Sequence, residues 1–208
     1  FSFYATKNLT TGEGGMLTGQ PELIARARTL GLHGMSRDAW KRYGPGGSWF
    51  YSVDDPGFKY NMTDIQAAMG LAQLRKLESF QRRRRQIVDA YNRAFGGIAS
   101  LEVPTERPDV EHAWHLYVLR LRPGTLRIDR DRFIEELTER NIGTSVHFIP
   151  IHLHPYYRQK YSYAPSALPV AWTNYQRMLS LPLHPMLTDQ DVNDVIAAVL
   201  DVAGRFAR

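Results

Sequence analysis

The sequence has no cysteine and no apolar run long enough to cross a lipid bilayer. Without cysteine the chain can form neither disulfide bonds nor thiolate metal sites, which fits a reducing compartment. No stretch approaches the roughly 20 consecutive apolar residues that a spanning helix needs, and the first residues lack the basic region of a secretory signal. These absences predict a cytoplasmic protein with no membrane partner.

The chain also lacks an initiating methionine and begins with apolar residues. Phe1, Phe3 and Tyr4 have the composition of the end of a buried β-strand. A total of 208 residues, 43% hydrophobic and 12% aromatic, is ample for a packed core. We therefore expect a fragment of a longer protein, with partner strands and part of any active site on polypeptide outside these 208 residues.

The net charge of +5 raises the question of nucleic-acid binding, most obviously at the run Arg82–Arg85. Thr63 and Gln66 form a capping-box pattern, and apolar residues then recur at helical spacing as far as Gly96 and Gly97. This pattern predicts one long amphipathic helix over 64–95. Successive arginines point to different sides of such a helix, so we expect them to be solvated or paired with carboxylates, with no nucleic-acid role.

The first half of the chain alternates a strand, a glycine turn and a helix. Pro21 opens the predicted helix, and Gly31 is expected to end it as a left-handed cap. Residues 33–58 hold many glycines and aromatics without a clear period, which indicates a long loop. Such a loop covers a ligand or a subunit interface, or it is a plain surface excursion. We favour the interface.

The second half repeats the alternation of strands and helices. We expect a strand over 114–121, a helix capped by Asp129 and ended by Asn141 and Gly143, a strand over 144–149, and a final amphipathic helix capped by Thr188. The fold class is therefore α/β. A composition change predicts two domains, residues 1–97 and 98–208.

Three histidines, His147, His152 and His154, fall close together and could suggest a metal site. Pro150 and Pro155 break regular structure between them, and no cysteine or carboxylate lies near in sequence to complete a ligand set. Hydrogen-bonding or substrate-contact roles are the better interpretation, and His147 is the best candidate for them.

Lys7 is the most informative residue of the chain. A lone loop lysine is usually a solvated surface charge. Lys7, however, lies between an apolar segment and the glycines of residues 12–15, with the hydroxyls of Ser2 and Thr6 nearby. Glycines allow the backbone to approach a phosphate closely, and a desolvated lysine amine can form a Schiff base with a carbonyl cofactor.

Five segments together resemble the DegT/StrS-type nucleotide-sugar aminotransferases. They are residues 2–15, 57–64, 112–116, 143–148 and 179–183, in the order that the family has. The resemblance implies the type I fold of pyridoxal phosphate (PLP) transferases, with part of the large domain followed by the small C-terminal α/β domain. The runs 59–61 and 112–116 are most similar to members that aminate UDP-4-keto-arabinose.

The resemblance also implies roles for single residues. Lys7 would hold PLP through a Schiff base and move protons during catalysis. Ser2 would bind the cofactor phosphate, and Lys59 or Asn61 would reach that phosphate from the second subunit of a homodimer with shared active sites. Many relatives have asparagine where this chain has Lys59. The expected substrate contacts are His147 and Tyr4.

The implied reaction transfers an amine from glutamate to a 4-keto nucleotide sugar in lipopolysaccharide or other cell-surface sugar biosynthesis, and UDP is the expected nucleotide. The acidic partner of the cofactor's pyridine nitrogen and the aromatic residue that stacks on its ring would precede Phe1. We therefore expect this chain to be inactive alone. One alternative is a catalytically silent partner or regulatory module. Another is a sugar dehydratase of the same fold, which Lys7 disfavours because such enzymes carry histidine there.

Overall fold

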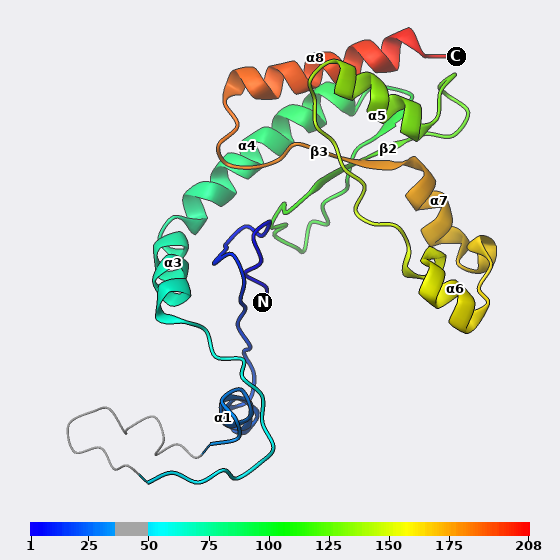
Figure 1. The fold of residues 1–208 in the computed structure, drawn as a ribbon. Helices are drawn as coiled ribbons and strands as arrows, with labels where there is room; N and C mark the ends of the chain where they lie inside the picture. Colours follow the sequence, from blue (N-terminus) through cyan, green and yellow to red (C-terminus); the bar gives the residue numbers. More distant parts are fainter. Residues whose placement is uncertain (36–49) are drawn as a thin grey trace. The chain divides into compact units, whose positions relative to one another are not determined.

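The structure is a computed structural model that describes residues 1–35 and 50–208. It forms two compact units, Phe1–Leu77 and Glu78–Arg208, whose elements are labelled in Figure 1. Each unit is described by itself. Within the described ranges, no helix combines the length and the apolar character needed to cross a membrane.

The first unit contains helices α1 (Pro21–Leu30) and α3 (Asp64–Leu74). Pro21 opens α1 as predicted, and the Thr63 and Gln66 capping box is formed in both directions at the start of α3. The predicted left-handed cap at Gly31 is wrong, because Gly31 stays right-handed at φ −68°. The chain instead turns at His33 and Gly34, which take positive φ values of 58° and 70°.

The strand predicted around Phe1–Tyr4 does not form. Ser2 makes only an isolated bridge with Gly15, while Phe1 is 81% exposed. The backbone hydrogen bonds of this segment include Phe3 N to Gly14 O, Met16 N to Phe1 O and Thr11 N to Phe3 O, each at 2.9 Å. These bonds close residues 1–16 into what we call the lysine loop.

The segments before and after residues 36–49 are clamped together. Met35 bridges Val53, and Asp54 N donates to Gly34 O at 2.8 Å. A Cβ on Gly34 would lie 1.7 Å from the carbonyl oxygen of Asp55, so only glycine fits this crossing. The aromatic-rich loop predicted over 33–58 falls largely outside the described residues.

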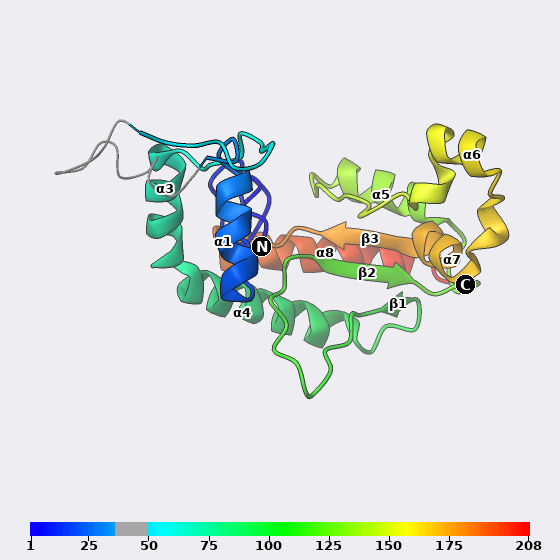
Figure 2. The ribbon, with the colours of Figure 1, turned by 90° about the horizontal axis from the view of Figure 1, so that it is seen from below.

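The second unit contains a three-stranded antiparallel sheet in the order β1 (Leu101–Glu102), β2 (Tyr117–Leu121) and β3 (Met178–Leu181). Helices α4 (Leu77–Phe95) and α8 (Asp189–Arg205) lie behind the sheet in Figure 2, and α5 (Arg130–Glu139) packs on α8. Alternate residues of β2 are buried against this layer. The core side chains with the least exposure include Tyr91, Phe95, Tyr117, Leu119, Phe133, Leu137, Leu179 and Val199.

The remaining helices connect this core to β3. They are η1 (Ile151–Leu153), α6 (Pro155–Tyr161), η2 (Pro165–Ala167) and α7 (Pro169–Arg177). The predicted caps of the longer helices are confirmed: Asp129 accepts from Arg132 N, and Thr188 forms a capping box with Asp191.

Two predicted elements in the longer segments are wrong. The single helix predicted over 64–95 is two helices, α3 and α4, separated by a turn at Arg75 and Lys76. The apolar residues of α3 stay exposed, whereas those of α4 enter the core. The helical spacing of apolar residues continues through both helices, so the spacing alone did not reveal the break between them. The strand predicted over 144–149 is reduced to a bridge between Ser145 and Ser180, because in this antiparallel register residues 148 and 149 would face residues 177 and 176, which belong to α7.

Helix α4 packs with the second unit. The two-domain prediction placed this helix with the first unit by setting the boundary near residue 97. The structure groups it with the later residues, because Ile87, Val88, Tyr91 and Phe95 are buried in the same core as the sheet.

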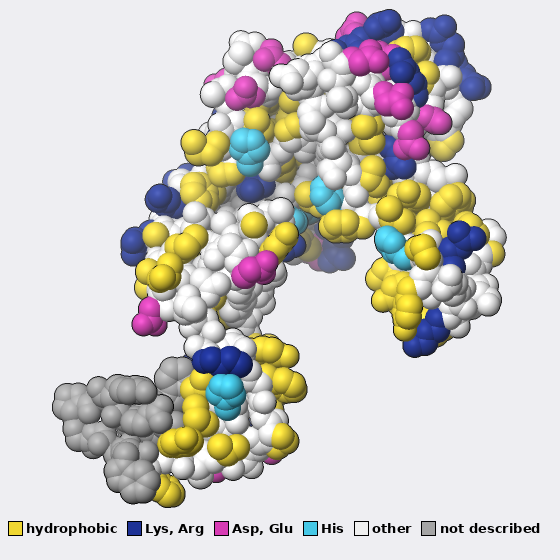
Figure 3. All heavy atoms as spheres, viewed as in Figure 1, with side chains coloured by type: hydrophobic (Ala, Val, Ile, Leu, Met, Phe, Trp, Pro, Cys, Tyr) yellow, Lys and Arg dark blue, Asp and Glu magenta, His cyan; other side chains and the backbone are white. Residues whose placement is uncertain are grey.

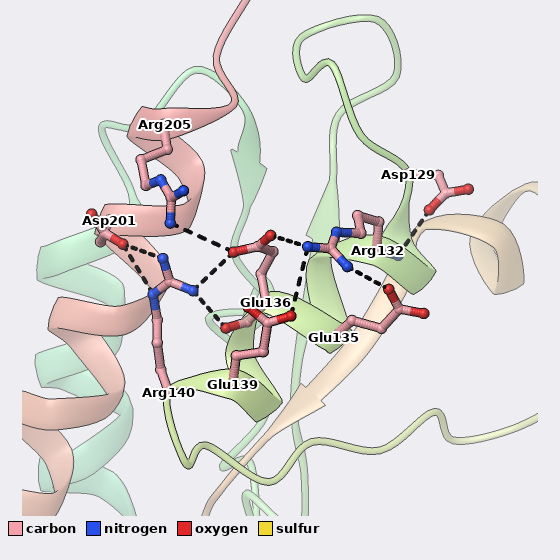
Figure 4. A network of polar contacts seen from close by, with 8 residues as sticks. All are labelled: Asp129, Arg132, Glu135, Glu136, Glu139, Arg140, Asp201 and Arg205. Carbon is pink, nitrogen blue, oxygen red and sulfur yellow. Dashed lines mark hydrogen bonds and ion pairs between the residues drawn. The ribbon is translucent and has the colours of Figure 1, made fainter.

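A buried carboxylate joins α5 to α8 (Figure 4). Glu136, whose side chain is 5% exposed, pairs with Arg132, Arg140 and Arg205, and Arg140 also pairs with Asp201 of α8. The hydrogen bond from Arg140 contributes most to lowering the pKa of Glu136, and Arg132 adds to the effect. Glu136 is therefore favoured in its charged form, and its ion pairs join α5 to α8.

Candidate active site

The lysine loop presents the amine of Lys7 without a competing partner. Lys7 N donates to Tyr4 O at 2.9 Å, and Thr11 N donates to Phe3 O at 2.9 Å, so the turn around Lys7 is fixed by its backbone. The Lys7 side chain is half-buried. Among the described residues, its Nζ has neither a hydrogen bond nor an ion pair. The amine is therefore available for chemistry.

The glycine turn after Lys7 is tightly built and supported by α3. Thr11 is buried, and its hydroxyl donates to Glu13 O at 2.6 Å. Gln66 of α3 donates to the same oxygen at 3.0 Å. A Cβ on Gly14 would lie 2.8 Å from Thr11 Oγ1, and one on Gly15 would lie 2.7 Å from Phe1 O. These contacts leave no room for a Cβ at Gly14 or Gly15, and the close approach of this backbone to a phosphate stays a prediction.

Ser2 and Tyr4 are exposed on the same loop as Lys7. Tyr4 N lies 3.4 Å from Ser2 Oγ and donates to it, so the hydroxyl proton of Ser2 remains free for an acceptor. Tyr4 is 48% exposed. The lysine loop thus carries a hydroxyl donor, an aromatic ring and an amine within residues 2–7.

Lys59 and Asn61 touch one another. Lys59 Nζ donates to Asn61 Oδ1, which shows that both side chains lie on the same side of the extended segment. This segment is held against the end of α1, because Phe58 N donates to Leu30 O at 2.6 Å and Tyr60 N to Gly31 O at 2.8 Å. The pair offers an ammonium and an amide together at an exposed position.

His147 lies in the second unit, at a cavity of about 210 Å³. Its Nδ1 is 2.9 Å from Ser180 Oγ, and His115 and Thr144 also line the cavity. The Oγ1 of Thr144 is buried without a partner among the described residues. Three of the five segments that carry the family resemblance, 112–116, 143–148 and 179–183, therefore meet at this cavity.

Arg84 fixes two walls of the His147 cavity, and the sequence prediction missed it. Its side chain is buried, and Nη1 donates to Trp114 O at 3.2 Å, His115 O at 3.4 Å and Leu183 O at 2.9 Å. Burial lowers the pKa of this guanidinium. Arg84 precedes the buried residues Ile87 and Val88 at helical spacing, and this signal could have identified it.

The other arginines of the run behave as predicted. Arg82 pairs with Glu78, Arg83 with Asp189, and Arg85 with Glu106. Arg85 and then the His112 N–H hold the pKa of Glu106 at about 2, well below its ordinary value. Three of the four arginines are thus paired with carboxylates, and Arg84 donates to backbone carbonyl oxygens instead.

Comparison with known proteins decides the family. The family model described as the DegT/DnrJ/EryC1/StrS aminotransferase family matches residues 1–200. The chain belongs to this family. Its fold, a type I PLP-transferase fold with part of the large domain and the small C-terminal domain, is therefore confirmed.

Curated members of the DegT/DnrJ/EryC1/StrS family are similar over about half of their own length. An uncharacterised protein of Methanocaldococcus jannaschii is 54% identical over 96% of this chain and 52% of its own. The spore coat polysaccharide biosynthesis protein SpsC of Bacillus subtilis is 52% identical over 97% of this chain and 52% of its own. The chain thus spans about half the length of these relatives.

A solved structure agrees with this assignment. Spr1654 of Streptococcus pneumoniae, a candidate sugar aminotransferase in its PMP form, has a TM-score of 0.86 at 34% identity, covering 99% of this chain and 52% of that one. Its PLP form has a TM-score of 0.85. Pyridoxal phosphate is therefore the cofactor of the family, as predicted. The relatives and structures described here do not confirm UDP-4-keto-arabinose as the substrate.

The residues on the described segments fit this cofactor. PLP has an aldehyde, which needs an amine, and a phosphate dianion, which needs donors and positive charge. Lys7 supplies an amine with no partner among the described residues, Ser2 a free hydroxyl proton, and Lys59 an ammonium.

Proposed function

We propose that this chain is the lysine-bearing part of a PLP-dependent enzyme that aminates the keto group of a nucleotide sugar. The observation that carries the proposal is the Lys7 amine, held on a hydrogen-bonded loop with no partner among the described residues, in a chain of an aminotransferase family. The finer proposal is a UDP-linked 4-keto sugar with glutamate as amino donor.

Lys7 performs the covalent and proton-transfer steps of this proposal. When bound, PLP supplies a reactive carbonyl carbon and a ring that accepts electrons. Lys7 would hold the cofactor by condensing its amine with that carbon, with loss of water, and it would be released as a free amine when the amine of the donor takes its place. The free amine then moves a proton between the substrate carbon and the cofactor's C4′, as a general acid and base. A carboxylate paired with Lys7 would oppose this by keeping the amine charged, and the described residues place none there.

The phosphate of the cofactor requires donors from this chain. Ser2 is proposed to donate its hydroxyl proton to a phosphate oxygen. The pair Lys59 and Asn61 is proposed to contact the same phosphate from the second subunit of a homodimer, with Lys59 supplying charge and Asn61 orienting the ammonium through their hydrogen bond. Tyr4 and His147 are proposed to contact the substrate.

The remaining parts of the active site are proposed to lie outside these 208 residues, since the relatives are about twice as long. We therefore expect no transamination by this chain alone. SpsC is a spore coat polysaccharide biosynthesis protein. This relationship supports a role in cell-surface sugar biosynthesis, carried out in the cytoplasm.

Covalent trapping tests the role of Lys7 independently of activity. The full-length protein with PLP is reduced with borohydride, digested and analysed by peptide mass. We expect the cofactor mass on the peptide that contains Lys7, its loss in Lys7→Ala, and its retention in the control Lys76→Ala. A trapped cofactor on another lysine, or none in well-folded protein, would overturn the proposal in favour of a catalytically silent module.

The substrate is tested by product analysis. Full-length protein is incubated with glutamate and UDP-, dTDP- or GDP-linked keto sugars, and formation of 2-oxoglutarate and of the amino sugar is followed. The expected result is equal amounts of both products, with UDP sugars preferred. A sugar product without nitrogen would instead indicate a dehydratase.

A further inference from the structure

The segment 141–188 contains no aspartate or glutamate, although the chain has 21 acidic residues in all. It holds the cations Arg158, Lys160 and Arg177. On the face drawn in Figure 3, the part of the second unit that carries α6 shows hydrophobic and basic side chains and no acidic ones. An acid-free surface of this kind attracts an anionic partner.

Helix α6 buries none of its seven residues. Tyr156, Tyr157, Tyr161 and Tyr163, on this helix and just after it, are 61%, 39%, 51% and 49% exposed. Together with Lys160 we call them the tyrosine patch. Exposed aromatic rings in a cluster are uncommon on a free surface and indicate a binding site.

The rings of the tyrosine patch form a connected surface. Tyr157 and Tyr161 are nearly parallel, with centroids 6.4 Å apart and 14° between their planes, and Tyr161 is 5.9 Å from Tyr163. A flat ring that stacks on Tyr161 is therefore nearly parallel to Tyr157 as well. This geometry suits a planar aromatic ligand.

The cation of the tyrosine patch lies beside these rings. Lys160 Nζ is 5.5 Å from the centroids of both Tyr156 and Tyr161, and it donates to Tyr156 Oη at 3.2 Å. Neither Lys160 nor Arg158 makes an ion pair within the described part of the chain. One unneutralised cation, Lys160, thus adjoins the stacking surface.

We propose that the tyrosine patch binds the nucleoside diphosphate portion of the substrate, an inference that rests on the nucleotide-sugar function proposed above. The base stacks on Tyr161, and the diphosphate pairs with Lys160. A nucleoside diphosphate joins one flat aromatic group to adjacent negative charges, which is the complement of this surface. Stacking reads the ring face common to all bases, so the patch supplies affinity more than base selectivity.

Equilibrium titration of the full-length protein without PLP tests this inference. The ligands are UDP, uridine and inorganic pyrophosphate, and the variants are Tyr161→Ala, Tyr161→Phe and Lys160→Gln. Arg82→Gln removes an equal charge from an exposed position outside the patch and serves as the control. Circular dichroism checks the fold of each variant.

We expect Tyr161→Ala to weaken UDP binding about tenfold and Tyr161→Phe to change it little, since phenylalanine keeps the stacking face. Lys160→Gln should weaken UDP and pyrophosphate alike by severalfold and leave uridine unchanged. With the cofactor present, Tyr161→Ala and Lys160→Gln should raise KM for the nucleotide sugar at nearly constant kcat, and Tyr161→Phe should leave both values nearly unchanged.

Three results would overturn the inference. The first is equal UDP affinity in all variants. The second is a changed oligomeric state in Tyr161→Ala with unchanged UDP affinity, which would make the patch a protein interface. The third is tighter binding of single-stranded RNA than of UDP with a steep salt dependence, which would make it a nucleic-acid surface. Borohydride trapping at Lys7 is measured in a separate experiment. Loss of nucleotide binding at the tyrosine patch is therefore distinguished from loss of cofactor attachment at Lys7.

Discussion

The two units of the chain differ in what holds them together. Every buried hydrophobic side chain among the described residues belongs to the second unit, beginning with Ile87. In the first unit, the described residues that are buried are Thr11 and Gly34. The unit that carries Lys7 is therefore shaped by backbone hydrogen bonds and glycine contacts, and the other by a packed core.

Because of this difference, we expect the first unit to determine cofactor attachment and the second unit to determine the free energy of unfolding. Helices α1 and α3 bury none of their residues, so their apolar faces remain available to polypeptide outside the described residues. Substitutions in the second unit should change the free energy of unfolding, whereas substitutions in the lysine loop should change cofactor attachment.

The largest expected contrast is between two phenylalanines. Phe95→Ala removes a side chain with 0% exposure from the core and should lower the free energy of unfolding by about 3–5 kcal/mol. Phe58→Ala removes a ring that is 55% exposed in the first unit and should change it by less than about 0.5 kcal/mol. Urea unfolding followed by circular dichroism measures both. Equal losses would show that the first unit has a core of its own.

The next contrast lies between neighbouring turns of α4. Arg84→Ala leaves three carbonyl oxygens without their buried donor, and we expect a loss of about 3 kcal/mol. Arg82→Ala removes an exposed cation whose partner is the exposed Glu78, and it should have little effect. The same unfolding experiment measures both variants. An unchanged free energy of unfolding in Arg84→Ala would mean that water donates to the three carbonyl oxygens in place of the guanidinium.

A smaller effect is expected in the lysine loop, on function and not on unfolding. Gly15→Ala introduces a Cβ 2.7 Å from Phe1 O and should reduce the fraction of cofactor trapped on Lys7 severalfold. Gly19→Ala, whose Cβ would make an ordinary 3.5 Å contact with Leu23, is the matched control. Peptide mass after borohydride reduction gives the trapped fraction. Equal trapping in both variants would contradict the role of the tight turn.

The smallest effect concerns pH. Arg85 and the His112 N–H lower the pKa of Glu106 from 4.5 to about 2, so folding favours the charged carboxylate. The resulting stability is fully present above about pH 4.5 and is lost as the pH falls towards 2. Glu106→Gln should unfold with a shallower pH dependence across this window. Identical pH profiles for both proteins would refute the contribution of Glu106.

Local signals in the sequence predicted the local features of the fold. Thr63, Asp129 and Thr188 cap helices because a side-chain oxygen within three residues of the free N–H groups suffices. The failed predictions depended on distant residues. The strand at Phe1 required a neighbouring strand to pair with. The break between α3 and α4 depended on packing, because the apolar residues of α4 are buried in the core and those of α3 are exposed.

The candidate site shows the same division. Lys7 could be identified from sequence because its family segment is contiguous, and so could the contact of Lys59 with Asn61, two positions apart on an extended segment. Arg84 could not be separated from its neighbours while the run Arg82–Arg85 was treated as one charged group. Its role depends on carbonyl groups 30 and 99 positions away in the sequence.

The clamp at Gly34 has a consequence for protein engineering. Met35 and Val53 are bridged, and Gly34 accepts from Asp54, so both ends of the intervening segment are fixed by bonds that do not depend on its length. A Cβ at position 34 would lie 1.7 Å from the carbonyl oxygen of Asp55, so any larger residue there would push the two ends apart. Gly34 is therefore a position to leave unchanged when the sequence around the clamp is altered.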